Sequence, residues 1–256
     1  MKIGVLLLPT DPWQESVATA QRIEALGYNH LWVYDHFTWR RYHDRAWHAT
    51  YPWLAGIAAL TSTIPLGTMV ANPNIRHPLL LAKDAMTIDH ISGGRLILGI
   101  GSGWFERDYT EFGYEFGTAG DRLRRLDANL PVIKERLGKL TPQPVRDIPI
   151  LIGGGGEKVT LRIVAQHADI WHGFYSAKEP DQFARKNNVL DDWCAEVGRD
   201  PSAIERSAGV NPTKIEAMDR LVPSGVQQVT LGFSGPHYDL GVVTDWLAWR
   251  DELNAA

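Results

Sequence analysis

The sequence predicts a single α/β domain over residues 1–256, folded as a (β/α)8 TIM barrel. Two observations favour this fold. Short apolar runs, typical of strands that are buried on both faces of a parallel sheet, recur along the chain and alternate with helical patterns. The length of 256 residues is also usual for one such barrel, and no long linker or low-complexity segment divides the chain.

Eight apolar segments are expected to form the strands. They are residues 2–8, 30–34, 65–70, 96–100, 149–152, 169–172, 204–210 and 226–233. Apolar side chains at helical spacing, together with Pro and Gly at the ends, predict the helices between them. These are residues 12–26, 51–61, 79–91, 120–137, 157–167, 179–197 and 244–253. Residues 105–116 are expected to be a polar–aromatic connector, and residues 211–225 leave room for only a short helix.

Composition excludes several functional classes. The net charge is −4 and both signs are interspersed, so the chain lacks the basic stripe of a nucleic-acid binder. A single cysteine, Cys194, allows neither an internal disulfide nor a CxxC metal site and fits a reducing cytoplasm. The apolar run Ile3–Leu8 is too short to span a membrane. We therefore expect a cytoplasmic protein without nucleic-acid or membrane partners.

Reactive groups of such barrels lie at the carboxyl ends of the strands, and Asp35 and His36 follow the second strand. An imidazole titrates near neutrality and can give or take a proton during turnover. The adjacent carboxylate could orient the imidazole, although neighbouring side chains on a strand point to opposite faces. The alternative is a capping aspartate beside a solvated histidine.

Two glycine-rich bends follow later strands. Gly99, Gly101 and Gly103 alternate around the Ser102 hydroxyl, which would let the backbone approach a flat or anionic ligand or would simply make a tight turn. The run from Gly153 to Lys158 precedes a helix, where free amides and the helix dipole favour phosphate.

Metal-dependent hydrolysis and a serine nucleophile find little support. The chain contains neither HExxH nor GxSxG. The segment from Phe37 to Trp53 is rich in aromatic, Arg and His residues and is too long for a plain turn. It is expected to be a lid or a pocket wall, although such side chains equally often serve packing.

The run from Asn74 to Gly113 strongly resembles the bacterial luciferase-like monooxygenase superfamily, and most closely its coenzyme F420-dependent oxidoreductase branch. WVYDHF after the second strand, GTMV at the third and ILIGGGGEKVTLRIVAQHADIW from the fifth onward support the resemblance. It covers most of residues 1–175 and fades beyond them. Related members use FMN instead of F420.

The resemblance implies a flavin or deazaflavin at the carboxyl-terminal mouth of the barrel. The Met69–Val70 bond would be the family's non-proline cis peptide, which bends the deazaflavin ring. Asp35 would lie near this ring, and His36 would be the proton donor or acceptor at its reacting edge. Trp104 replaces an acid of the sugar-phosphate-oxidising relatives, which argues against such a substrate. The implied cofactor-binding residues are Asp35, Met69, Val70, Ser102, Gly103, Trp104, Gly154, Gly155, Gly156, Glu157 and Lys158.

These observations predict an oxidoreductase that moves a hydride between coenzyme F420 and a small organic substrate. An FMN-dependent monooxygenase that receives reduced flavin from a partner reductase is the alternative, and a barrel that binds a ligand without turnover is the third hypothesis. A homodimer is expected on the resemblance alone.

Overall fold

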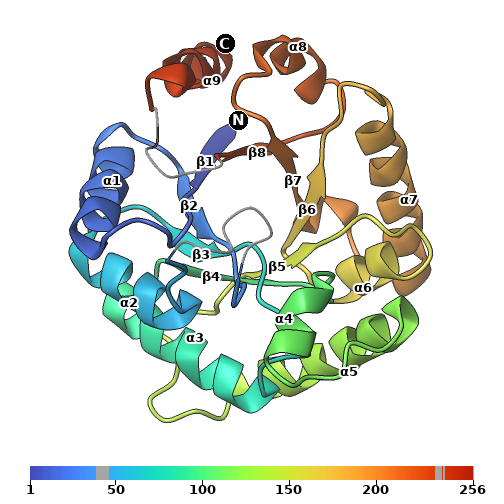
Figure 1. Ribbon diagram of the computed structural model, residues 1–256. Coiled ribbons are helices and arrows are strands. Elements are labelled where there is room, and N and C mark those ends of the chain that lie inside the picture. Colours follow the sequence, from blue (N-terminus) through green and yellow to red (C-terminus); the bar gives the residue numbers. More distant parts are fainter. Residues whose placement is uncertain (39–45, 234–237, 239, 256) are drawn as a thin grey trace.

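The computed structural model describes residues 1–38, 46–233, 238 and 240–255. Its parallel strands close into one barrel in the order β1 to β8, and the larger helices surround it (Figure 1). The strands are β1 (Lys2–Leu6), β2 (His30–Val33), β3 (Leu66–Thr68), β4 (Leu96–Ile100), β5 (Ile150–Gly153), β6 (Ile170–Phe174), β7 (Glu205–Val210) and β8 (Gln228–Gly232). The predicted fold class and all predicted strands are confirmed.

The predicted helices are confirmed, with shifts of a few residues at some ends. They are α1 (Trp13–Ala25), α2 (Thr50–Leu60), α3 (Pro78–Ser92), α5 (Ala119–Leu137), α6 (Thr160–His167), α7 (Gln182–Val197), α8 (Met218–Leu221) and α9 (Thr244–Ala255). Within the described ranges, no helix combines the length and apolar character that crossing a bilayer requires.

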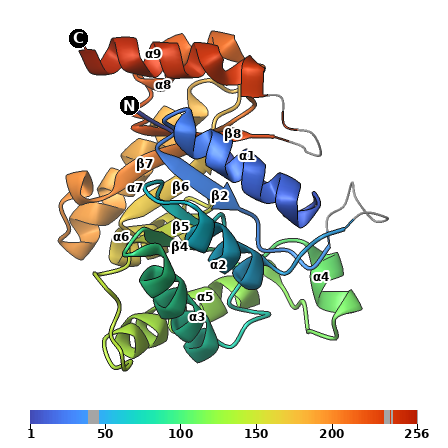
Figure 2. The ribbon, with the colours of Figure 1, turned by 90° about the vertical axis from the view of Figure 1, so that its left-hand side faces the viewer.

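One helix differs from the sequence prediction. Residues of the expected polar–aromatic connector form α4 (Glu106–Glu111), which lies beyond the carboxyl ends of the strands, at the right of Figure 2. A helix of six residues spans fewer than two turns, so no apolar period can develop that would predict it from sequence. This helix supplies one of the functional side chains described below.

Local sequence explains where the longer helices begin and end. The His77 side chain accepts a hydrogen bond from the Leu79 amide at the start of α3, and Pro78 occupies its first position. Gly93, with φ of 65°, closes that helix in the left-handed region. Thr118 and Asp121 form a reciprocal capping box at the start of α5.

Two apolar layers hold the barrel together. The larger layer lies between the strands and the helices, where it includes Trp246 of α9; the Trp246 indole is fully buried and donates to the Pro212 carbonyl at 2.8 Å. The second layer fills the barrel interior, as in other barrels of eight strands. It consists of Leu6, Leu8, Trp32, Met69, Ile97, Leu151 and Ile170.

Gly99 is required by the close approach of β3 and β4. A Cβ atom at this position would lie 1.9 Å from the Thr68 carbonyl oxygen, a backbone atom that cannot move aside independently. We expect Gly99→Ala to lower the free energy of unfolding by about 2–3 kcal/mol, measured by urea denaturation. Gly232→Ala is the matched control, since its Cβ would come no closer than 3.9 Å to a neighbouring atom. Equal stability of the two variants would contradict this packing.

Candidate active site

A cavity of about 740 Å³ opens at the carboxyl ends of the strands. Its volume is typical of a site for a cofactor and a small substrate. Ten of the residues singled out in the sequence line it: Asp35, His36, Met69, Val70, Gly101, Ser102, Gly103, Trp104, Gly153 and Gly154. The fold therefore brings most of the predicted site residues together, while the next residues along the chain, 155–158, lie outside this lining.

His36 is held by an acid that the sequence did not reveal. Its Nδ1 lies 2.6 Å from Oδ2 of Asp108, and the Asp108 side chain is only 3% exposed. The other carboxylate oxygen, Oδ1, accepts hydrogen bonds from the backbone amides of Phe37 and Thr38 at 3.2 and 3.1 Å. Helix α4 thus fixes both the imidazole and the turn that carries it.

Asp35 pairs with Arg76 and not with the neighbouring His36. Its carboxylate is fully buried and accepts hydrogen bonds from Nη2 and Nε of Arg76 at 2.7 and 2.8 Å, a bidentate pair. The Arg76 guanidinium also stacks on the Tyr51 ring, 4.7 Å from its centroid. Burial by itself lowers the pKa of Arg76, but hydrogen bonding and charge attraction from Asp35 raise it above the usual value. Arg76 therefore holds the Asp35 side chain in the cavity wall.

The Asp35–Arg76 pair predicts a stability effect. Arg76→Ala would leave a buried carboxylate without its guanidinium partner, so we expect the free energy of unfolding to fall by about 2–3 kcal/mol. Urea denaturation at neutral pH measures it. Lys139→Ala is the control, because Lys139 and Glu135 form an exposed pair and their separation should leave stability nearly unchanged. Equal effects of the two substitutions would contradict the role assigned to Arg76.

The Met69–Val70 peptide bond is cis, as the resemblance implied. Both residues line the cavity, and the Val70 side chain packs where two glycines leave room. A Cβ at Gly101 would lie 2.5 Å from Val70 Cγ2, and one at Gly153 would lie 2.9 Å from Val70 Cγ1. These glycines therefore let Val70 form part of the cavity wall.

Gly103 is enclosed by protein atoms in the same way. It has a φ of 71°, and a Cβ would lie 2.2 Å from the Tyr109 hydroxyl and 2.4 Å from Nδ2 of Asn72. The preceding Ser102 carbonyl accepts a hydrogen bond from Nδ2 of Asn74 at 2.6 Å. The alternating glycines of this bend thus make room for residues of β3, of the segment that follows it and of α4. The sequence interpretation had offered a ligand or a tight turn as their reason.

Aromatic rings surround the His36 imidazole. Trp104 and Phe105 meet it edge-on, with ring centroids 6.1 and 5.5 Å away, and Tyr34 and Trp47 contact it from other sides. The Trp47 indole also donates to the His36 carbonyl at 2.6 Å. Trp47 brings the predicted Phe37–Trp53 segment against His36, but the described residues of that segment, 37–38 and 46–53, do not line the cavity; residues 39–45 lie outside the described residues.

The glycine run after β5 lies beside a lysine from α7. The Gly154 amide donates to the His172 carbonyl at 3.0 Å, and a Cβ at Gly155 would lie 2.7 Å from Nζ of Lys186. Lys158, the cation suggested by sequence, is exposed, and Glu157 forms an ion pair with Arg185 at 2.5 Å. Lys186 is remote in sequence from the glycines, so only the fold reveals this cation.

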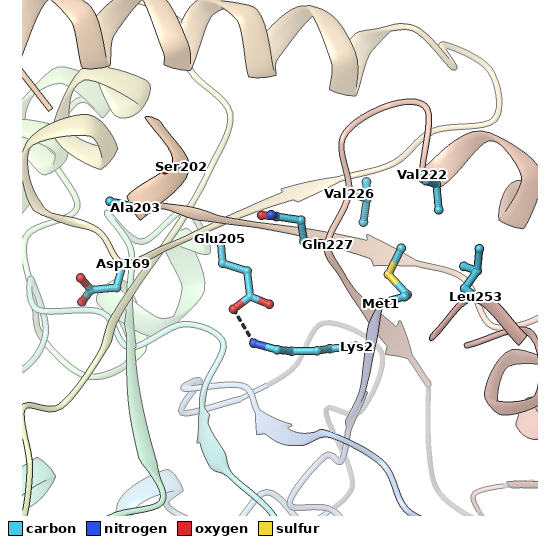
Figure 3. A pocket seen from close by; sticks show the side chains of 10 residues that line it. All are labelled: Met1, Lys2, Asp169, Ser202, Ala203, Glu205, Val222, Val226, Gln227 and Leu253. Atoms are coloured by element: carbon cyan, nitrogen blue, oxygen red, sulfur yellow. Dashed lines mark hydrogen bonds and ion pairs between the residues drawn. The ribbon is translucent and has the colours of Figure 1, made fainter. Parts of the chain in front are cut away.

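A second cavity, of about 710 Å³, lies at the opposite end of the barrel (Figure 3). The ion pair of Lys2 and Glu205, at 2.9 Å, belongs to its lining. Barrel enzymes carry their catalytic groups at the carboxyl ends of the strands, so the His36 cavity is the candidate active site. Within the ranges that the structure describes, no cluster of three or more His, Cys, Asp or Glu side chains could hold a metal ion.

The sequence pattern of the luciferase-like monooxygenase family matches residues 1–221 of the chain. This match extends over most of the barrel. The chain belongs to the luciferase-like monooxygenase family. Family membership agrees with the closed barrel and with the position of the cavity at its carboxyl-terminal mouth.

Two relatives illustrate the range of the family. An uncharacterized protein of Mycobacterium bovis is 28% identical, in an alignment that covers 91% of this chain and 92% of the other. An F420-dependent glucose-6-phosphate dehydrogenase of Amycolatopsis mediterranei is 30% identical over 57% of this chain and 49% of that protein. The resemblance to F420-dependent members is thus confirmed at the level of sequence similarity.

Solved structures share the fold at low identity. An F420-dependent secondary alcohol dehydrogenase in complex with an F420–acetone adduct has a TM-score of 0.80 and 17% identity, over 94% of this chain and 96% of that one. The F420-dependent tetrahydromethanopterin reductase from Methanopyrus kandleri has a TM-score of 0.78 and 18% identity, over 95% and 96%. The monooxygenase RslO1 from Streptomyces bottropensis has a TM-score of 0.78 and 17% identity, over 100% and 99%.

Proposed function

We propose that this family member is a coenzyme F420-dependent oxidoreductase that transfers a hydride between the deazaflavin and a carbonyl compound or its alcohol. The observation that carries the proposal is the His36–Asp108 pair, which places an oriented imidazole in the wall of a cofactor-sized cavity. Similarity to F420-dependent relatives in sequence and fold supports it.

The residues present fit a phosphorylated, flat cofactor. Val70 packs against Gly101 and Gly153 and gives one wall of the cavity an apolar surface for a flat ring. The glycine run from Gly154 offers backbone amides, and Lys186 offers an ammonium group beside it. Together they would bind the phosphate of the cofactor tail and offset its negative charge. Met69, Ser102 and Trp104 would complete the binding surface, and Gly156, Glu157 and Lys158 would extend it beyond the cavity.

Coenzyme F420, when bound, supplies the hydride donor or acceptor. The chain supplies the proton: in carbonyl reduction Nε2 of His36 protonates the substrate oxygen, and in alcohol oxidation it accepts the hydroxyl proton. Asp108 holds the ring and offsets the charge of its protonated form. The rings of Phe105 and Trp47 pack edge-on against the imidazole.

The FMN-dependent monooxygenase is the second candidate, because RslO1 shares the fold over the whole chain. Reduced FMN reacts readily with oxygen, whereas the reduced deazaflavin reacts poorly. The test supplies the protein with reduced F420 and a panel of ketones, and separately with reduced FMN and oxygen. Oxidation of F420 that depends on the ketone, without oxygen consumption, is expected. Oxygen-dependent product formation with FMN and no reaction with F420 would reject the proposal.

Lys186 gives a prediction about the phosphate end of the cofactor. Removal of one charge-assisted contact typically weakens binding by about 1.5–3 kcal/mol when desolvated, so Lys186→Met should raise the Kd for F420 about tenfold. Fluorescence titration measures this value. Lys178→Met, on the exposed segment before α7, is the control. An unchanged Kd for Lys186→Met, or an equal loss in the control, would remove Lys186 from the site.

A further inference from the structure

A polar patch lies on the β6–β8 wall of the active-site cavity. It is formed by His172 of β6 and Thr230 of β8, which both line the cavity and are only 4% and 3% exposed. In the barrel order β6 is four strands from β2, so the strand that carries His172 lies across the barrel from the strand that leads to His36; Figure 1 shows the two strands. The proposed proton transfer uses neither residue.

The His172 ring presents a hydrogen-bond donor. Its Nδ1 lies 2.9 Å from the hydroxyl oxygen of Ser207, which is fully buried. In the described part of the chain this hydroxyl has no other partner, and a buried hydroxyl proton without an acceptor is costly, so we assign the hydroxyl as donor to Nδ1 and the ring proton to Nε2. Burial lowers the pKa of His172 to about 4, so the ring is neutral near neutral pH.

Gly209 of β7 lets the Phe174 and His172 rings pack close to the strand, since a Cβ there would lie 2.8 Å from Cδ1 of Phe174. Nε2 of His172 lies 3.2 Å from the point where a Cβ on Gly209 would stand, and Gly209 is paired in register with Thr230. On its other side Thr230 is paired with Gly4. Thr230 thus lies between two glycines, against which the rings of Trp32 and Phe174 pack.

The missing partner of the Thr230 hydroxyl is evidence for a ligand. Its Oγ1 is buried, and among the described residues it has no hydrogen-bond partner. A buried hydroxyl without a partner costs about 1–3 kcal/mol, so a bound molecule that reaches it gains a favourable contact. The cavity lining in the described ranges contains no lysine or arginine, so this wall suits an uncharged oxygen and not a phosphate or a carboxylate.

From these contacts we infer that His172 and Thr230 form a subsite for a second, uncharged oxygen of the substrate. The substrate class is then an alcohol or carbonyl compound that carries a further hydroxyl or carbonyl group away from the reacting carbon. This inference rests on the proposed function for the reacting end of the substrate. The recognition of the second oxygen depends only on the residues of the β6–β8 wall.

Two matched ketones test the subsite: 4-hydroxycyclohexanone and cyclohexanone. Calorimetry measures their Kd values in the cofactor-free protein and in the protein loaded with oxidised F420. We expect the hydroxyketone to bind about tenfold more tightly, which corresponds to about 1.4 kcal/mol. Thr230→Val and His172→Phe should each remove most of this preference and leave the Kd of cyclohexanone unchanged. Thr230→Ser and His172→Gln, which keep a hydroxyl and an N–H donor, should retain it.

Three results would overturn the inference. Equal binding of the two ketones by the parent protein, or binding of neither, would show that no such subsite exists. If both Thr230→Val and His172→Phe keep the preference for the hydroxyketone, the second oxygen is bound elsewhere. A raised Kd for F420 in these variants, with the ketone preference intact, would assign the pair to the cofactor. Failure of the proposed function would have a different result, namely that F420 does not bind. In that case the comparison of the two ketones in the cofactor-free protein would still test the subsite.

Discussion

His36→Ala is expected to lower turnover with F420 and substrate about 10²–10⁴-fold, the usual contribution of a positioned general acid or base. The imidazole lies in the cavity wall in a fixed orientation, because Asp108 holds Nδ1 at 2.6 Å. Steady-state kinetics measure the loss. The Kd for F420, measured by fluorescence, should change little, because the substitution removes a proton carrier and not a phosphate contact.

A second histidine serves as the control for this substitution. His90, on α3, is exposed and lies 2.7 Å from the Gln143 carbonyl through Nε2. His90→Ala should leave turnover within about twofold of the parent protein, since surface substitutions away from the site have small effects. Unchanged turnover in His36→Ala would remove His36 from the mechanism.

Asp108→Asn is expected to lower turnover about 10²-fold. The amide can still accept the backbone hydrogen bonds of Phe37 and Thr38, but it no longer offers a negative charge to the imidazole. In hydrolytic triads, loss of the equivalent charge at unchanged geometry is more damaging still. Glu111→Gln on the same helix is the control, because Glu111 pairs with Arg107 at the surface.

A double-mutant cycle separates positioning by Asp108 from a general structural effect. If Asp108 acts through His36, then Asp108→Asn in the His36→Ala background should cause little further loss of turnover. Additive losses would show that Asp108 acts on the reaction by another route. Both variants should keep the parent protein's affinity for F420.

The strands could be predicted because each strand of a parallel barrel is buried on both faces and is therefore a short apolar run, as in β4 (Leu96–Ile100). Helix α4 could not, since six residues carry no readable period. The contact between His36 and Asp108 could not be predicted either, because Asp108 belongs to this helix and lies 72 positions from His36 in the sequence.

Adjacency in sequence also misdirected the interpretation of Asp35. Side chains of neighbouring residues diverge at the end of a strand, so Asp35 turns to Arg76, 41 positions further on. Lys186 shows the same limit, because a lysine of α7 reaches the glycines after β5 only in the folded barrel. Motifs located the strand ends, but partners remote in sequence required the structure.

An equilibrium titration of the purified protein with coenzyme F420, and separately with FMN, tests the proposed function most directly. Fluorescence reports both cofactors. The proposal predicts that F420 binds in the micromolar range, about −8 kcal/mol, and that FMN binds at least tenfold more weakly. FMN binding tighter than F420 binding would contradict the proposal and would make an oxygen-using monooxygenase the function to pursue.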